Sequence, residues 1–333
     1  MLVGLSFRII EPEKKLGDQM KLGPYGILLG LVLGLARITA SATSMDAQFS
    51  AAIGAGLSLS HDNEGFSTQR ISIEYFPRYQ NADLLTGLRA TTHSYGQNNW
   101  SRSGQQLTFF HRNIDPATAN GWQLEAGLFG QGGHTLLTLD GSCRKALAER
   151  TGLELFVNRD WVETAKALDN GVHFTFAGVA LEQGLGERMT VVGVAGRQEF
   201  SDGNNRNHGR LKLIFQPDPD SGLTFQVRYR AYTSSSDNVG GFYFNPANYN
   251  EAMLALGWRK KIPGWNLSLT GGIGQQKVAD GPYRATHLLE GSVQNAPSRP
   301  YSLRVRAGLN QSAAFNGPNY RYSYLLSEWI IPF

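Results

Sequence analysis

The chain has 333 residues, a formal net charge of +4, 41% hydrophobic residues and only 17% charged residues. Its mean hydropathy of −0.28 excludes a polytopic helical membrane protein, which would need runs of about 20 apolar residues. No basic stripe is present, so we expect no nucleic-acid partner. The single cysteine, Cys143, excludes an internal disulfide framework and a cysteine-based zinc cluster.

The N-terminal residues 1–42 are predicted to be an extension followed by a signal peptide. Tyr25–Ala36 is apolar, and Ala40–Ala42 has the small-x-small form of a cleavage site. The apolar stretch is too short to cross about 30 Å of hydrocarbon. We therefore expect translation to start at Met20, cleavage to follow Ala42, and the mature domain to cover 43–333. The alternative is an N-terminal membrane anchor.

Beyond residue 46, apolar and polar residues alternate in a long series of segments. Across 223–230, Leu, Phe, Val and Tyr alternate with Thr, Gln and two Arg residues. Because successive side chains of a strand point to opposite faces, each segment has one apolar and one polar face. The predicted strands are 47–60, 67–76, 84–95, 101–112, 122–131, 134–147, 151–158, 172–183, 188–199, 207–216, 223–233, 250–261, 264–276, 283–294, 300–311 and 320–333.

These segments predict an all-β fold, a transmembrane antiparallel up-and-down β-barrel of about sixteen strands, because many have the length of tilted membrane strands. Short turns and longer polar loops such as Ser234–Asn250 tend to alternate, as they do in barrels with periplasmic turns and longer external loops. An even count returns both termini to the periplasmic side. Asn113–Gly121 is an exception, a long connection on that side, and Trp161–Leu168 predicts one or two helical turns in an external loop.

The C-terminus indicates where the barrel is located. Trp329, Ile331 and Phe333 share one parity, and Phe333 is the last residue. Aromatic rings are favoured at the membrane interface, and this ending resembles the last strand of outer-membrane barrels, whose terminal aromatic is read by the assembly machinery. We therefore expect a bacterial outer-membrane location, with outer-membrane lipid and the barrel assembly machinery as partners. A soluble secreted sandwich is the alternative.

The polar parity of the strands is assigned to the interior, because a charged side chain facing lipid near the midplane costs roughly 2–4 kcal/mol. Two interpretations of that interior remain open: arginine–carboxylate pairs that brace the wall, or a water-filled, mildly basic channel, for which sixteen strands are wide enough. The predicted pore-lining residues are Arg70, Glu74, Arg89, Arg112, Arg197, Glu199, Arg228, Arg230, Glu251, Arg259, Arg304 and Arg306.

No catalytic constellation emerges from the sequence. Seven histidines are scattered along it, without metal-ligand spacing and without an HExxH or GxSxG motif. We therefore expect no catalytic residues, no cofactor and no metal. A lipid-modifying barrel enzyme, with His111 and His287 as candidates, is an alternative that rests on fold analogy alone.

From about residue 147 to 333, the order of motifs resembles the barrel of exopolysaccharide export proteins. Glu199–Asn204 (EFSDGN) ends a strand and is followed by Arg206, and Phe242–Pro246 (FYFNP) precedes Tyr249 and Trp258. Those proteins are the outer-membrane porins for poly-N-acetylglucosamine and, more distantly, cellulose. The resemblance implies a barrel of similar strand number that carries a polysaccharide cargo.

The resemblance also implies a loop in which Phe242, Tyr243, Phe244 and Tyr249 contact the glycan or fold in as a plug; packing against the rim is the alternative. The family usually bears an N-terminal scaffold of tetratricopeptide repeats, which this sequence lacks. Either a separate periplasmic repeat-domain protein supplies it, or the barrel has another task.

We therefore expect a non-enzymatic porin that exports a secreted polysaccharide. The basic lumen favours a neutral or anionic glycan over a cationic one. The alternatives are a general or solute-specific diffusion porin, the lipid-modifying enzyme, and a structural barrel with a closed lumen.

Overall fold

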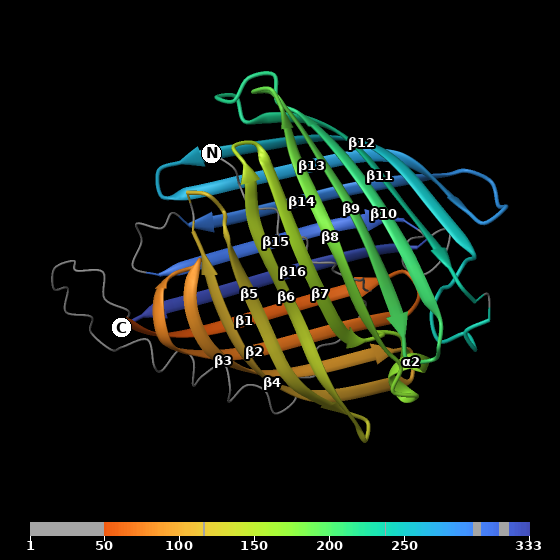
Figure 1. Cartoon of the computed structure of the whole chain (residues 1–333). Coiled ribbons are helices and arrows are strands. Elements are labelled where there is room, and N and C mark those ends of the chain that lie inside the picture. Colours follow the sequence, from red (N-terminus) through yellow and green to blue (C-terminus); the bar gives the residue numbers. More distant parts are fainter. Residues whose placement is uncertain (1–49, 116, 237, 296–300, 313–319) are drawn as a thin grey trace.

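The computed structural model describes residues 50–115, 117–236, 238–295, 301–312 and 320–333. These residues form a closed barrel of sixteen antiparallel strands in which the first strand pairs with the last (Figure 1). The predicted fold class is confirmed. The predicted signal peptide and the start of the first predicted strand lie outside the described residues.

Strand boundaries follow the alternation closely, within three residues of the prediction except at the end of the second strand. The strands are β1 (Ser50–Asp62), β2 (Phe66–Asn81), β3 (Leu84–Gln97), β4 (Trp100–Ile114), β5 (Gly121–Gln131), β6 (His134–Ala148), β7 (Thr151–Trp161), β8 (His173–Leu185), β9 (Met189–Phe200), β10 (Asn205–Phe215), β11 (Leu223–Ser234), β12 (Asn248–Ile262), β13 (Trp265–Val278), β14 (Arg284–Asn295), β15 (Ser302–Gln311) and β16 (Arg321–Pro332).

Strand β2 is longer than predicted because it continues through a proline. The predicted strand ends at Phe76, whereas β2 continues past Pro77 to Asn81. Its register against β3 shifts between Tyr75 and Arg78. A proline donates no ladder hydrogen bond, so it is tolerated in a sheet where a bulge interrupts the pairing.

The outer face of the barrel is apolar. Leu128, Leu137, Leu254 and Ile273 leave 60%, 61%, 62% and 66% of their surface exposed. A closed sheet leaves no unpaired strand edge, so every strand can face hydrocarbon without exposing backbone polar groups. Within the described residues, no helix is long and apolar enough to cross a membrane.

The two ends of the barrel differ. At one, here called the terminal end, β1 begins and β16 finishes, and the Phe333 N–H donates to the Ala51 carbonyl at 2.8 Å. The other, the loop end, carries helix α2 (Ala165–Asp169) inside the β7–β8 connection (Figure 1). The predicted helical turn thus exists but begins only at Ala165, because Trp161 still belongs to β7 and the Thr164 hydroxyl caps the helix by accepting from the Ala167 N–H.

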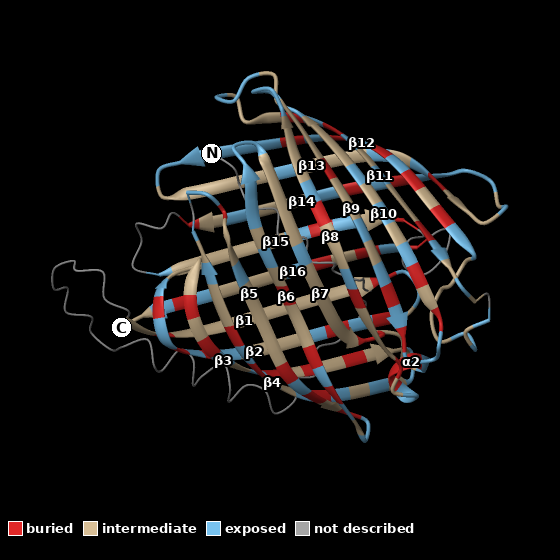
Figure 2. Ribbon diagram, viewed as in Figure 1, coloured by how far each residue is buried: buried red, intermediate tan, exposed pale blue. Residues whose placement is uncertain are grey.

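Buried side chains gather on the inner face in separate clusters, and buried segments lie beside α2 in Figure 2. Near the terminal end, Phe76 and Phe110 pack edge to face, with 5.1 Å between ring centroids. Near the loop end, inner-face aromatic residues surround Leu168 of α2, which is completely buried. The barrel is therefore filled by side chains toward its loop end, and the space below them is available for a site.

Candidate functional site

A polar cavity of about 1960 Å³ occupies the lumen. Its lining begins at terminal-end connections, including Asp115 and Gly222. It ends below the loop end at Trp161, Glu163 and Arg206. The cavity thus runs along most of the barrel, and its upper limit is set by the residues that fold into the loop end.

Among the described residues, two connections fold into this end of the barrel, and together we call them the cap. They are residues 162–172, which include α2, and the described residues of 235–247. The Leu168 side chain packs among Phe66, Tyr95 and Phe129 of the inner wall. Gln131 also donates a side-chain hydrogen bond to the Leu168 carbonyl oxygen at 2.9 Å. Burial of a whole leucine side chain stabilises this arrangement by roughly 1.5–3 kcal/mol.

Ion pairs connect the cap to the barrel wall on the side of β2–β4. Arg70 of β2 pairs with Glu163, whose carboxylate also accepts a hydrogen bond from the Tyr95 hydroxyl at 3.3 Å. Arg102 of β4 pairs with Asp169 at the end of α2. The Trp100 indole N–H also donates to the Asp169 carboxylate, at 3.0 Å, so Arg102 and Trp100 of β4 hold it together.

The second half of the cap is held by Arg206 of β10. Its guanidinium lies 5.0 Å from the Phe200 ring centroid and 5.2 Å from that of Tyr243. It also donates to the Asn245 side-chain oxygen at 3.2 Å and to the Phe244 carbonyl oxygen. Cation–π contacts and hydrogen bonds therefore converge on one arginine.

Tyr243 stacks on Phe200 with ring centroids 4.4 Å apart and an interplanar angle of 12°. Its hydroxyl donates to the Asp202 carboxylate at 2.9 Å. Burial raises the pKa of the Tyr243 phenol above its usual value, so the hydroxyl remains a donor. The two halves of the cap also bond to each other, since Lys166 donates to the Gly240 carbonyl oxygen at 2.6 Å.

The predicted loop aromatics have different positions. Phe242, Tyr243 and Phe244 are half-buried in the cap, where Phe242 and Tyr243 pack against the cluster that contains Phe200 of β9. Tyr249 is a correction: it lies in β12, is 1% exposed, and bonds to Ser312 at 2.9 Å. A side chain buried in the wall cannot contact a glycan. The predicted strand begins at residue 250, one residue after Tyr249, whereas β12 begins at Asn248.

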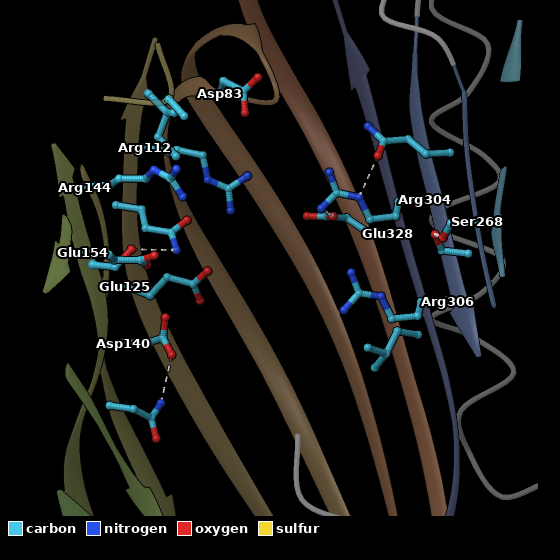
Figure 3. Close-up of a pocket in the computed structure, with 18 of the residues that line it drawn as sticks. Asp83, Arg112, Glu125, Asp140, Arg144, Glu154, Ser268, Arg304, Arg306 and Glu328 are labelled. Carbon is cyan, nitrogen blue, oxygen red and sulfur yellow. Dashed lines mark hydrogen bonds and ion pairs between the residues drawn. The ribbon is translucent and has the colours of Figure 1, made fainter. Parts of the chain in front are cut away.

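Below the cap, the inner face of β2–β8 carries paired charges, and we call it the paired wall. Glu74 lies 2.5 Å from the Arg89 guanidinium, which also contacts Glu125 at 2.7 Å. Arg144 contacts Glu182 at 3.1 Å. Figure 3 shows Glu125 and Arg144 projecting from this wall. Partners within hydrogen-bond distance offset the cost of removing these charges from bulk water.

The inner face of β10–β15 is different, and we call it the cationic wall. Its two carboxylates are Glu251, which accepts from Arg230 at 2.7 Å, and Glu290, which accepts from the Tyr324 hydroxyl at 2.9 Å. The cations of this face outnumber them. They include Arg206, Arg210, Lys212, Arg228, Arg230, Arg259, Lys261, Arg304 and Arg306.

Ten of the twelve predicted pore-lining residues lie on the inner face. Of these, Arg228 and Glu251 face inward without bordering the cavity, and Glu251 is only 5% exposed. Arg112 borders the cavity and donates to the Ala82 carbonyl oxygen at 2.9 Å. The cavity-lining set is Arg70, Glu74, Arg89, Arg112, Arg230, Arg259, Arg304 and Arg306.

Arg197 and Glu199 are corrections, because they lie on the outer face of β9. Their intervening neighbour Gln198 lines the cavity, so the two flanking residues point outward. They contact each other at 3.1 Å and their side chains are 54% and 67% exposed. Both lie near the loop-end terminus of the strand, where a charge on the outer face costs little.

Several residues of the site were missed by the sequence analysis. Arg210 and Lys212 share the parity of His208 on β10, so strict alternation could have placed them inside. Glu163 had no such signal, because it lies in a connection and meets Arg70 only through the fold.

No catalytic or metal centre is evident in the part of the chain that the structure describes. No three His, Cys, Asp or Glu residues of that part gather as a metal site. His111 and His287 lie on the outer face of β4 and β14. The His111 ring bonds to the Thr86 hydroxyl at 2.8 Å and lies 4.5 Å from the Trp122 ring centroid.

The sixteen-strand closed barrel, its apolar exterior and its polar lumen define a bacterial outer-membrane β-barrel. No protein-family model matches the chain, and no curated protein matches its sequence. Among solved structures, it is similar to a "Bacterial polysaccharide outer membrane secretin", with a TM-score of 0.66, 13% identity, and coverage of 86% of this chain and 100% of that one. At this identity the likeness shows the fold.

Solved structures of OprD proteins are also similar. OprD from Pseudomonas aeruginosa has a TM-score of 0.42 and 11% identity, with 88% of this chain and 97% of that chain covered. An OccD1 (OprD) variant has a TM-score of 0.43 and 12% identity, with the same coverage.

Proposed function

We propose that this barrel is a non-enzymatic channel that exports a secreted polysaccharide. The observation that carries the proposal is the long polar cavity that reaches the terminal-end connections and stops below a cap tied to the wall by side chains. A polymer would enter at the terminal end, taken as periplasmic, and leave when the cap moves aside.

The chemistry of the lining suits a hydroxyl-rich polymer. Guanidinium groups such as Arg112 and Arg304, amides such as Gln123, and hydroxyls such as Ser268 and Thr138 all border the cavity. These groups donate and accept hydrogen bonds at many points, as sugar hydroxyls require. Because the polar groups are spread along the cavity, a polymer would make many weak hydrogen bonds with the lining, and weak binding at each point would let it move through the barrel.

The motifs that resemble exopolysaccharide exporters meet in one place. The EFSDGN segment supplies Phe200 and Asp202, and the FYFNP segment supplies Tyr243 and Asn245. Arg206 joins them. This convergence at the exit, together with the polysaccharide secretin among the similar structures, supports cargo export over a purely structural barrel. A separate periplasmic repeat-domain protein would then deliver the polymer to the terminal end.

Deletion of the gene tests the proposal. We expect carbohydrate polymer to disappear from the culture medium while its precursors are still made, and a plasmid copy of the wild-type gene to restore it. Normal secretion in the deletion strain would refute the proposal.

A diffusion porin for small solutes is the second candidate, favoured by the charge difference between the paired and cationic walls. Opposed charges across a lumen orient and select small ions. Liposomes that contain the wild-type barrel would then admit small sugars and anions freely. Under the export proposal, the cap keeps this uptake low.

Phe333 remains the predicted contact for the barrel assembly machinery. Its backbone is fixed by the Ala51 carbonyl, while 55% of the residue is exposed. We expect deletion of Phe333 to reduce the amount of folded barrel in the outer membrane, measured by its resistance to unfolding in detergent at room temperature.

A further inference from the structure

The register of two neighbouring strands sets cations opposite one another inside the lumen. Lys212 of β10 pairs directly with Arg228 of β11, and Arg210 pairs with Arg230. Arg210 and Arg230 border the cavity, and Lys212 and Arg228 share their strand parity. The four side chains therefore share the inner face, although Lys212 and Arg228 do not themselves border the cavity. Directly opposed residues have Cβ atoms roughly 4.5–5.5 Å apart, and like charges at that separation destabilise a sheet.

For Lys212 and Arg228, no nearby carboxylate offsets this repulsion by an ion pair within the described residues. Glu251 is engaged by Arg230, Tyr249 and Ser312 at the corner where β11 and β12 meet the end of β15. Glu290 accepts from the Tyr324 hydroxyl, and its charge acts on Lys212 and Arg228 without forming an ion pair with either.

Arg228 instead donates to a neutral acceptor, the Gln226 side-chain oxygen, at 2.7 and 3.0 Å. Within the described ranges, Lys212, Arg228 and Arg259 have no carboxylate at ion-pair distance. Arg259 enters from β12 and is one of the cations whose charge acts on Lys212. On the paired wall, by contrast, Arg89 forms ion pairs with two carboxylates, those of Glu74 and Glu125.

We propose that Lys212, Arg228 and Arg259, together with Arg210, form a binding site for the acidic substituents of an anionic saccharide. A carboxylate or sulfate at this place would accept charge-assisted hydrogen bonds and relieve the repulsion between the strands. The inference deepens the proposed export function, on which the choice of a saccharide ligand rests. It assigns the exported polymer to the acidic class.

Calorimetric titration of the full-length barrel in detergent tests the site. The probes are trigalacturonate, which carries carboxylates, maltotriose as a neutral sugar of equal length, and inorganic sulfate as a free anion. We expect trigalacturonate to bind at low salt, to weaken at high salt, and to bind more tightly than maltotriose. Sulfate should compete with it, since both use the same anionic chemistry.

Two variants that replace a cation by a carboxylate test where trigalacturonate binds. Lys212→Glu places a carboxylate opposite Arg228, so it should weaken trigalacturonate binding roughly tenfold or more while raising the melting temperature of the barrel. Arg197→Glu makes the same change in charge on the outer face of β9 and should leave binding unchanged. A Lys212→Glu barrel that melts higher but binds poorly cannot be explained by misfolding.

Equal binding of trigalacturonate and maltotriose would overturn the inference, as would equal losses in the two variants. Sulfate that binds while trigalacturonate does not would overturn the saccharide assignment. The two proposals fail separately: normal secretion in the deletion strain removes export and leaves this titration intact, whereas a failed titration leaves export of a neutral polymer in place.

Discussion

The charged side chains on the two walls of the lumen have different partners. On the paired wall, arginines meet carboxylates, as Arg89 meets Glu74 and Glu125. On the cationic wall, Lys212 and Arg228 face each other across a strand pair. The difference indicates that the first wall braces the barrel and holds part of the cap, while the second is left for an external anion. The arginine–carboxylate pairs of the first interpretation are present on the paired wall, and the water-filled basic channel remains a prediction.

The largest effect should follow from breaking the paired wall. Arg89→Met leaves Glu74, which is 6% exposed, without its cation. Removing one partner of a buried ion pair costs about 3–5 kcal/mol, and we expect a loss of this size in the free energy of unfolding, measured by urea titration in lipid vesicles. Arg259→Met on the cationic wall is the matched control and should change the free energy by less than about 1 kcal/mol. Equal losses would erase the distinction between the walls.

An intermediate effect is expected at the cap. Arg206→Ala removes the contacts to Phe200, Tyr243 and Asn245, which we expect to cost about 2 kcal/mol. Because the cap limits the cavity, single-channel conductance in a planar bilayer should rise several-fold. Arg197→Ala, on the outer face of the adjacent strand, is the control. Unchanged conductance in Arg206→Ala would mean that the cap does not obstruct the lumen.

The smallest effect concerns ion selectivity. Arg306→Gln removes one cation from the cavity lining, so the current should become less selective for anions in a salt gradient. Glu182→Gln on the paired wall should shift the reversal potential the opposite way. The measurement is best made in the Arg206→Ala background, where current is large. Shifts of the same sign would contradict the assignment of charge to the two walls.

The strands were predictable because each carries one apolar and one polar face, and this local property needs no knowledge of neighbours. The alternation did not predict side-chain orientation where both faces of a strand are apolar. In β9, Val191, Val192 and Val194 are apolar on both parities, so the orientation of Arg197 and Glu199 could not be read. The extension of β2 through Pro77 depends on a register shift against β3, which only the pairing reveals.

The candidate site was predictable only in part for a related reason. Alternation places arginines inside, but it does not say which carboxylates they meet. The opposition of Lys212 and Arg228 depends on the register set by the hairpin between β10 and β11. The pairing of Arg70 with Glu163 depends on a connection folding inward across the barrel. Both contacts join residues that are distant in the sequence, and they form only when the barrel is folded.

The central claim is that cargo leaves only when the cap moves, and a reversible restraint on the cap tests it most directly. Thr164 donates its hydroxyl to the Phe242 carbonyl oxygen, so the two halves of the cap meet there. Cells would carry Thr164→Cys and Phe242→Cys in a Cys143→Ser background, treated with a short cleavable bismaleimide. Either single cysteine variant is the control. We predict that crosslinking stops polymer release and that cleavage of the linker restores it; release that continues through the crosslinked barrel would contradict the account.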